Sequence, residues 1–239
     1  MAAKAKKVSA KKAAKPAPPS VNEVLRELQA NGSPQYKIDM AARYGIVTKA
    51  PVYGVRVVTL REMAKRIGKD HKLADALWRS GLHDARMLAT MVDDPELVTP
   101  AQMDRWAKDF DNWGLVDTAC FTLFDRTPHA FAQIDKWAKS NDEYVKRAAF
   151  ALLACVALHG HGRDADYLKR MALMKRAATD ERNFVKKGVS WALRAIGGKK
   201  SPKLRAAARE LAAELAASED STARWIGKDV LRDFAKGKR

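Results

Sequence analysis

The sequence is poor in cysteine and has no long apolar run, and both absences exclude classes of protein. Its two cysteines, Cys120 and Cys155, lie in apolar stretches with no second Cys or His at a zinc-ligand spacing. We therefore expect neither a disulfide scaffold nor a structural zinc site, and reduced thiols fit a cytoplasmic protein. The longest apolar run, from Ala148 to Leu158, has 11 residues. Because a membrane-spanning helix needs about 20 residues, a transmembrane protein is excluded.

Acidic residues are scarce relative to basic ones. The 239 residues include 45 Lys and Arg but only 28 Asp and Glu, which gives a formal net charge of +17. Residues 1–20 contribute +6, residues 21–120 sum to zero and residues 121–239 contribute +11. This balance predicts a polyanionic partner, with nucleic acid the first candidate and an anionic membrane surface the second.

The first 20 residues form a Lys-, Ala- and Pro-rich segment that contains nothing large to bury. We expect residues 1–20 to be disordered and residues 21–239 to form a single domain. The segment has neither the apolar region of a secretory signal nor the arginines of a mitochondrial presequence. Two interpretations stay open: an arm that tethers DNA by counterion release, or a solubilising tail.

The rest of the chain has the pattern of an all-α protein. Prolines outside the tail fall between segments in which apolar residues recur every three to four positions. Thr99 followed by Pro100 predicts a helix start. Ser140, with the acid Glu143 three residues later, predicts a second start in the segment 140–143 with Ser140 as the cap. Gly160 and Gly197–Gly198 predict helix ends. No alternating strand pattern of useful length is present. We expect ten or more helices.

A repeat is visible in the second half of the chain. Residues 144–153 align with residues 184–193 at an offset of 40 and with residues 225–234 at a further 41, each beginning with an aromatic residue followed by Val or Ile. Residues 113–123 fit the pattern loosely. A period near 40 with two helices per unit is typical of HEAT and armadillo repeats, which stack into a curved α-solenoid.

Basic residues recur at one repeat position. Arg147, Lys187 and Lys228 are equivalent in the alignment, and Lys146 and Lys186 are their neighbours. Equivalent positions of stacked repeats lie on one continuous surface, so we expect a basic stripe along the concave face. The alternative is that these residues belong to separate solvated helix faces. A membrane-bound amphipathic helix is less favoured, because the apolar faces are needed for stacking.

Asp117 interrupts this basic surface. It lies one helical turn after Trp113, close to the position that later repeats give to a basic residue, and Trp191 lies in the repeat that begins at Phe184. An acid on a DNA-binding stripe repels phosphate, so its presence is better explained if it meets a positive charge that develops during a reaction. The alternative is that the tryptophans are core residues and that Asp117 pairs with a nearby Arg or Lys.

Several strings resemble the DNA alkylation repair family, the AlkD-like HEAT-repeat DNA glycosylases. In this sequence they occupy residues 42–46, 69–74, 77–86, 110–117, 144–147, 180–187, 191–194 and 223–226. Together they run from about residue 35 to residue 235 and follow the order of the family.

The resemblance implies a monofunctional DNA glycosylase that excises cationic alkylated purines, of the N3-methyladenine and N7-methylguanine types, from duplex DNA. It implies that Asp117 is the catalytic carboxylate and that Trp113 and Trp191 flank the lesion. It also implies that Arg147 holds the DNA backbone, and we expect Arg194 on the same DNA-binding face. Gly114 departs from the family, in which many members have an acid.

The chemistry needs few groups. A cationic purine leaves without protonation, so one carboxylate can stabilise the sugar cation that develops. We expect no metal and no cofactor, because His159 and His161 are too close in sequence to share a helix face and no ligand cluster is evident. The resemblance further implies that the enzyme grips the DNA backbone without a base-flipping pocket.

Other functions stay open. We expect a monomer without an obligate protein partner. The alternative to the enzyme is a noncatalytic HEAT-repeat protein that binds damaged or branched DNA. A protein-interaction scaffold is less favoured, because it explains neither the charge of +11 on residues 121–239 nor Asp117.

Overall fold

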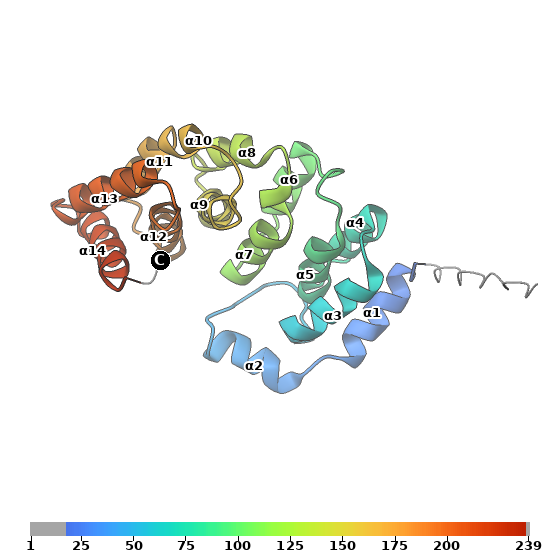
Figure 1. The fold of residues 1–239 in the computed structure, drawn as a ribbon. Coiled ribbons are helices and arrows are strands. Elements are labelled where there is room, and N and C mark those ends of the chain that lie inside the picture. The colour runs from blue at the N-terminus through green and yellow to red at the C-terminus, as the bar shows by residue number, and fades with distance from the viewer. Residues whose placement is uncertain (1–17, 238–239) are drawn as a thin grey trace, which may run out of the picture.

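A computed structural model describes residues 18–237, and these residues fold into helices joined by short loops (Figure 1). The elements are α1 (Val21–Ala30), α2 (Pro34–Ala42), α3 (Val57–Ile67), α4 (His71–Arg79), α5 (His83–Val92), α6 (Pro100–Ala107), α7 (Trp113–Thr122), the 3-10 helix η1 (Phe124–Arg126), α8 (Ala130–Trp137), α9 (Glu143–Leu158), α10 (Asp164–Leu168), α11 (Met171–Ala177), α12 (Asn183–Gly197), α13 (Pro202–Ala216) and α14 (Ser221–Ala235). The predicted all-α class is confirmed. The expectation for residues 1–20 falls almost wholly outside the described residues.

The helices stack into an arc with an inner and an outer layer. Figure 1 shows α7, α9, α12 and α14 on the inner side, with α8, α10, α11 and α13 outside them. The inner helix α9 packs against α7 and α12, and α12 packs against α14. The three aligned sequence repeats are therefore α9, α12 and α14, and the predicted HEAT-like solenoid is confirmed.

Most of the predicted helix boundaries are confirmed by the caps. The Thr99 side chain accepts a hydrogen bond from the Gln102 N–H at the start of α6, α12 ends at Gly197, and Gly160 follows the end of α9 with φ of 77°. The start of α9 differs from the prediction. Asp142 caps this helix, accepting from two backbone N–H groups, and Ser140 instead accepts from the Asp142 N–H.

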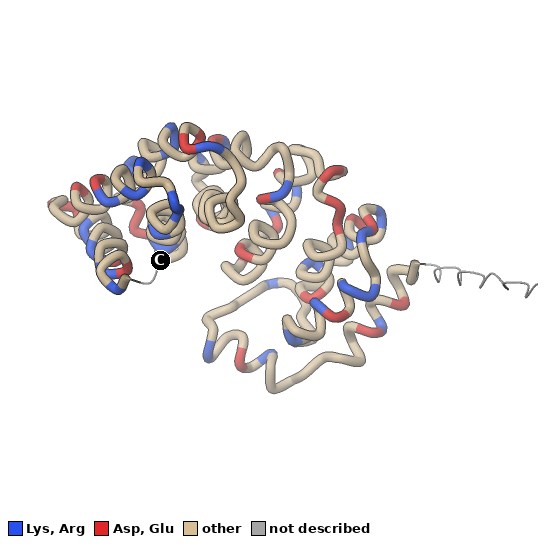
Figure 2. The backbone as a smooth tube through the Cα atoms, viewed as in Figure 1, with Lys and Arg blue, Asp and Glu red and all other residues tan. Residues whose placement is uncertain are grey.

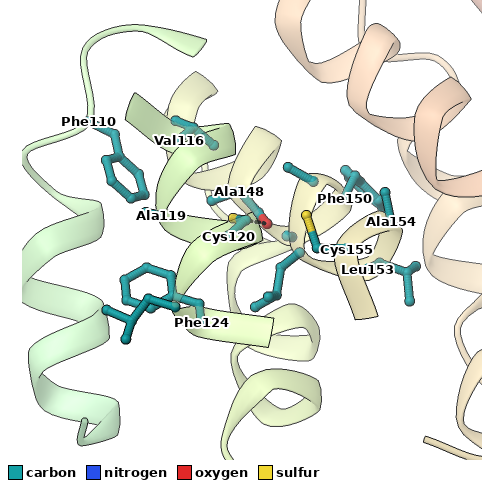
Figure 3. Packing of buried hydrophobic residues seen from close by; sticks show 14 of the residues in the cluster. Phe110, Val116, Ala119, Cys120, Phe124, Ala148, Phe150, Leu153, Ala154 and Cys155 are labelled. Atoms are coloured by element: carbon teal, nitrogen blue, oxygen red, sulfur yellow. Dashed lines mark hydrogen bonds between the residues drawn. The ribbon is translucent and has the colours of Figure 1, made fainter. Parts of the chain in front are cut away.

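One continuous apolar core runs through the described helices, from Val24 in α1 to Val230 in α14. Figure 3 shows part of it between α7 and α9, where Cys120 and Cys155 are both free and buried. Burial raises the pKa of both thiols well above the usual value. These cysteines are packing residues.

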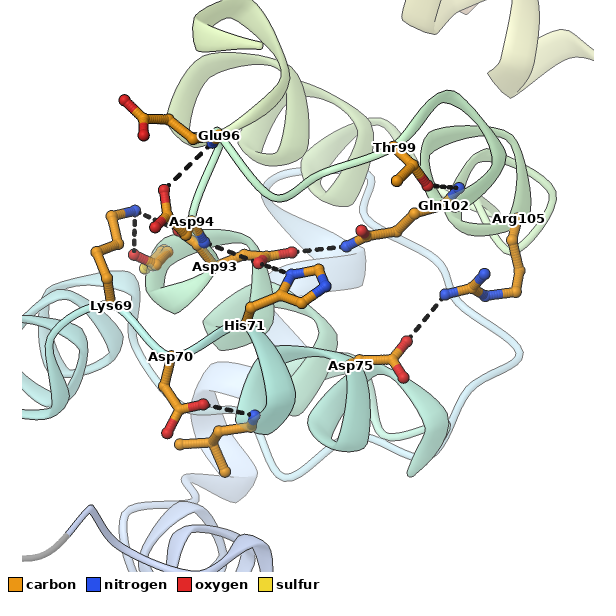
Figure 4. A network of polar contacts seen from close by, with 12 residues as sticks. Lys69, Asp70, His71, Asp75, Asp93, Asp94, Glu96, Thr99, Gln102 and Arg105 are labelled. Carbon is orange, nitrogen blue, oxygen red and sulfur yellow. Dashed lines mark hydrogen bonds and ion pairs between the residues drawn. The ribbon is translucent and has the colours of Figure 1, made fainter.

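Hydrogen bonds to two buried carboxylates hold several connecting segments in place. Figure 4 shows the buried carboxylate of Asp93, which accepts from Gln102 at 2.6 Å and contacts His71 Nδ1 at 2.7 Å. Asp84 is also buried and accepts from the backbone N–H groups of Tyr53 and Val55, each at 2.7 Å. The Asp93 contacts hold the starts of α4 and α6 at the C-terminal end of α5, and the Asp84 contacts hold the α2–α3 connection against α5.

None of the described helices is long and apolar enough to cross a membrane. This agrees with the short apolar runs of the sequence.

Gly227 allows α14 to lie close against the backbone of α13. A Cβ at this position would lie 2.2 Å from the Ala216 backbone nitrogen and 2.5 Å from the Ala212 carbonyl oxygen. Ala normally favours a helix over Gly by about 1 kcal/mol, but backbone atoms of α13 cannot move aside. We therefore expect Gly227→Ala to lower the free energy of unfolding by roughly 1–3 kcal/mol in urea denaturation.

Gly114→Ala is the matched control. Its Cβ would meet the end of the flexible Ile46 side chain at 3.0 Å, so we expect a change within about 1 kcal/mol. Equal effects of the two substitutions would contradict this account of the α13–α14 contact.

Candidate functional site: a groove along the inner helices

Two neighbouring hollows form a groove on the inner side of the arc, with volumes of about 530 and 380 Å³. Both are lined by Asp117, Arg147 and Lys187. The larger hollow continues over Ser190, Trp191, Arg194, Trp225 and Asp229. The smaller one continues over Tyr44, Gly45, Trp113, Asn183 and Phe184. The structure therefore brings Trp113, Asp117 and Trp191 to one groove, as the sequence predicted.

Asp117 and Arg147 form a bidentate ion pair where the two hollows of this groove meet. Arg147 Nε donates to one carboxylate oxygen at 3.0 Å and Nη2 donates to the other at 2.7 Å. The third nitrogen, Nη1, donates to the Phe184 carbonyl oxygen at 2.9 Å. The Arg147 side chain is 7% exposed, whereas that of Asp117 is 21% exposed. The pair thus joins α7, α9 and α12, and Asp117 is the member that faces the groove.

Burial and ion pairing act in opposite directions on Asp117. Removal from water raises the pKa of its carboxyl group above the usual value, and the charge and hydrogen bonds of Arg147 oppose this rise. A carboxylate has about four lone-pair sites, and Arg147 occupies two. The carboxylate therefore keeps acceptor positions for a group or a developing cation in the groove.

Trp113 and Tyr44 form one wall of the smaller hollow. Trp113 starts α7, whose cap is the Asn112 side chain, and its indole N–H donates to the Tyr44 carbonyl oxygen at 3.1 Å. The loop that carries Tyr44 is held by Asp111, which accepts from the Thr48 hydroxyl and the Lys49 N–H at 2.7 Å. Tyr44 was not assigned to the site from the sequence. It belongs to the string 42–46, which resembles the family, but only the folded loop shows that it lies beside Trp113.

Trp191 and Trp225 form the wall of the larger hollow. Trp225 is 38% exposed, and the Lys186 ammonium lies 5.3 Å from its ring centroid. The sequence analysis did not assign Trp225 to the site, although it opens the third repeat at the position that Tyr144 and Phe184 occupy in the others. The remaining tryptophans, Trp78, Trp106 and Trp137, are buried core residues.

Three of the six basic residues predicted for the DNA-binding face have acidic partners, namely Arg147, Lys146 and Arg194. Lys146 pairs with Asp180 at 3.1 Å, and Arg194 lies within 4 Å of both Asp229 and Asp233. Figure 2 shows both signs of charge along α13 and α14, whereas α12 carries basic residues alone. The alignment that predicted the stripe contained no information on these partners, which come from other helices or other turns.

Two lysines of the predicted stripe are more exposed. Lys187 lies between the two hollows and lines both. Lys228 is exposed on α14 but lines neither hollow. Lys187 is therefore the cation best placed to meet a ligand in the groove.

The groove has no group of metal ligands among the described residues, but such a group exists elsewhere. The nitrogen and oxygen donors of Asp125, His159 and His161 lie within 4.8 Å of one another. No ligand cluster was expected from the sequence, because His159 and His161 are too close in sequence to share a helix face. The helix ends at Leu158, so the turn after it brings both histidines to Asp125.

A solved structure shares this architecture. It is described as representing a new family of proteins related to the HEAT-like repeat DNA glycosylases, with affinity for branched DNA structures. It has 21% sequence identity to this chain and a TM-score of 0.76, and the match covers 92% of this chain and 95% of that one. At this identity the likeness establishes the fold.

A protein of Listeria innocua, named Uncharacterized protein Lin0241, is 25% identical over 123 residues. The match covers 50% of this chain and 54% of the relative, so the chain spans about half the length of the curated relative. It adds no information on function.

The family model of the DNA alkylation repair enzymes matches residues 24–235, from α1 to the end of α14. This range includes every residue of the groove. The chain belongs to the DNA alkylation repair enzyme family.

Proposed function

We propose that the protein is a monofunctional DNA glycosylase that hydrolyses the N-glycosidic bond of cationic alkylated purines, of the N3-methyladenine and N7-methylguanine types, in duplex DNA. One observation carries the proposal: a carboxylate, Asp117, is held between Trp113 and Trp191 in a groove of a family member. The enzyme acts as a monomer and needs neither a metal nor a cofactor for this reaction.

The carboxylate acts on the sugar. An alkylated purine that already carries a positive charge leaves as a neutral base, and the electrons of the glycosidic bond leave with it. Positive charge then develops at C1′ and the ring oxygen of the sugar. Asp117 stabilises this charge electrostatically and orients the water that attacks C1′. Trp113 and Trp191 hold the sugar–phosphate segment by van der Waals contact on either side.

Arg147 has a positioning role in this proposal. Its three side-chain nitrogens are engaged by Asp117 and the Phe184 carbonyl, so it fixes the rotamer of Asp117 and favours its ionised form. Lys187, which lines both hollows, meets the phosphates. The expectation that Arg147 also holds the DNA backbone stays a prediction, since this residue lines both hollows and keeps two further N–H donors.

A noncatalytic protein that binds branched DNA is the second candidate. Two observations favour it: the structural relative has affinity for branched DNA, and Asp117 already has a full ion-pair partner in Arg147. An acid whose charge is balanced by an arginine has a structural reason to be present. The two candidates differ in whether the protein releases the alkylated base at all, and in the first candidate this release depends on the Asp117 carboxylate.

The Asp117 carboxylate can be tested by Asp117→Asn. We expect the variant to lose at least about 100-fold in release of N7-methylguanine from duplex DNA, since an amide cannot stabilise the sugar cation. The assay measures strand breaks after alkali treatment of the resulting abasic sites. Asp75 is the matched control, because it also lies between two arginines, Arg79 at 2.7 Å and Arg105 at 2.9 Å, but on α4 outside the groove. Asp75→Asn should retain wild-type activity, and background breaks for the wild-type protein would favour the second candidate.

The positioning role of Arg147 predicts a pH effect. Asp117 works as the anion, so activity falls as the pH drops through its pKa, which burial raises and Arg147 lowers. Arg147→Ala removes the lowering influence, so we expect the acidic limb of the pH–rate profile to move to higher pH. Arg147→Lys keeps a cation and should move it less. Rates must be corrected for uncatalysed depurination, and an unmoved limb in Arg147→Ala would contradict the role.

The contact of Lys187 with phosphate predicts a salt effect. Each phosphate contact contributes about 0.9 to the slope of log K against log salt concentration. Lys187→Ala should therefore reduce the magnitude of this slope by about 0.9 in fluorescence anisotropy titrations with duplex DNA. Lys169, exposed at the end of α10 in the outer layer, is the control, and Lys169→Ala should leave the slope unchanged. Equal slopes for wild type and Lys187→Ala would remove Lys187 from the DNA-binding surface.

A further inference from the structure

A polar cluster at the far end of α9 has no part in the groove. It consists of Asp125 in η1, His159 directly after α9 and His161 in the following turn. His159 follows Arg147 by 12 positions, which corresponds to about 18 Å along the axis of α9. The cluster therefore lies outside the site described above and needs an explanation of its own.

The turn after α9 is built to bring the two histidines together. Gly160, between them, has φ of 77°, and Gly162 has φ of 76°, a region that glycine enters without strain. The backbone then returns toward the helix, with the His161 N–H donating to the Val156 carbonyl at 2.9 Å. The buried Tyr167 hydroxyl contacts the carbonyl oxygens of both Val156 and His161. The position of His161 is thus fixed by the fold.

Asp125 supplies a buried carboxylate to this turn. One of its oxygens, Oδ2, is hydrogen-bonded to His159 Nδ1 and lies 3.6 Å from His161 Nε2. The other oxygen, Oδ1, is buried and has no hydrogen-bond partner. A buried carboxylate oxygen without a partner is unfavourable. The hydrogen bond to His159 therefore does not by itself explain why a carboxylate is buried at this position.

The Asp93–His71 pair shows what a purely structural pair looks like in the same protein. Asp93 is also buried, but its oxygens are engaged by His71, by Gln102 at 2.6 Å and by the Asp94 N–H at 2.7 Å (Figure 4). Asp125 differs in two respects. One of its oxygens has no hydrogen-bond partner, and a second imidazole, that of His161, lies near the other oxygen.

We infer that Asp125, His159 and His161 bind a divalent transition-metal ion, with Zn²⁺ the first choice. Two imidazoles and one carboxylate are ligands that suit Zn²⁺ and its neighbours, whereas Mg²⁺ and Ca²⁺ prefer oxygen ligands alone. In a tetrahedral zinc site with bonds of about 2.0–2.1 Å, neighbouring ligand atoms lie about 3.3 Å apart. The 3.6 Å separation of Asp125 Oδ2 from His161 Nε2 is close to this value. His159 Nδ1 is hydrogen-bonded to the same oxygen, so this contact lengthens when the ion enters between them.

The exposure of the histidines defines the character of the site. Their side chains are 26% and 45% exposed, whereas that of Asp125 is fully buried. The ion would therefore sit at the surface with an open side, where water completes its coordination. It would join η1, which follows α7, to the α9–α10 turn, and binding to the folded chain alone would stabilise the protein.

The test uses the full chain without a histidine tag, treated with a chelator and then titrated with ZnCl₂ by calorimetry. We expect one Zn²⁺ per chain with a dissociation constant of about 10 µM or tighter, and a rise in Tm of about 5 °C at a hundredfold excess over that constant. Tetrahedral Co²⁺ bands in the visible spectrum should appear with the same stoichiometry.

His161→Ala is the decisive variant, because this side chain is exposed and its removal should leave the fold intact in circular dichroism. It should weaken Zn²⁺ binding at least 30-fold and abolish the rise in Tm. His129, half-buried at the start of α8 and outside the cluster, is the matched control, and His129→Ala should bind as the wild type does. Absence of binding by the wild type, or equal binding by His161→Ala, would overturn the inference.

Discussion

The ion pair between Asp117 and Arg147 is the contact on which the groove depends. It joins residues 30 positions apart on α7 and α9, and the third guanidinium nitrogen extends it to the α12 backbone. Three inner helices are thereby held in register at the point where the two hollows meet. Removing either partner would leave an unpaired buried charge, which destabilises the folded state. Neither residue can therefore be replaced without affecting the other. Any ligand or cation that Asp117 meets in the groove shares its carboxylate with Arg147.

The pair also changes the meaning of the net charge. A formal charge of +17 predicts a strongly basic binding face, but the inner helices carry many of their cations in ion pairs. Arg147, Lys146 and Arg194 each have an acidic partner. What distinguishes the groove is its aromatic content, with Trp113, Trp191 and Trp225 on its walls, together with Lys187. Such a surface suits a ligand that offers flat or apolar faces as well as phosphate.

Particular residues show how far the sequence could be interpreted. The repeat alignment placed α9, α12 and α14 correctly because helical periodicity is local and because each unit must bury the same apolar face. The start of α9 was assigned to the segment 140–143, yet Asp142 rather than Ser140 is the cap, since both residue types accept backbone N–H groups equally well. Tyr44 and Trp225 were not assigned to the site, and their positions depend on a loop anchored by Asp111 and on the stacking of the last repeat.

The sequence by itself determined the helical class, the repeat period and the family, and it singled out Trp113, Asp117 and Trp191, which line the groove in the structure. These follow from patterns within one helix or from the order of family strings along the chain. Only the tertiary structure decided which charges are paired and which metal-ligating side chains lie together. Both depend on distances between residues some 30 to 40 positions apart in the sequence. Asp117 with Arg147, Lys146 with Asp180 and Asp125 with His159 are all pairs of this kind. Sequence spacing cannot specify them, since the register of stacked helices is set by the packing of the whole core.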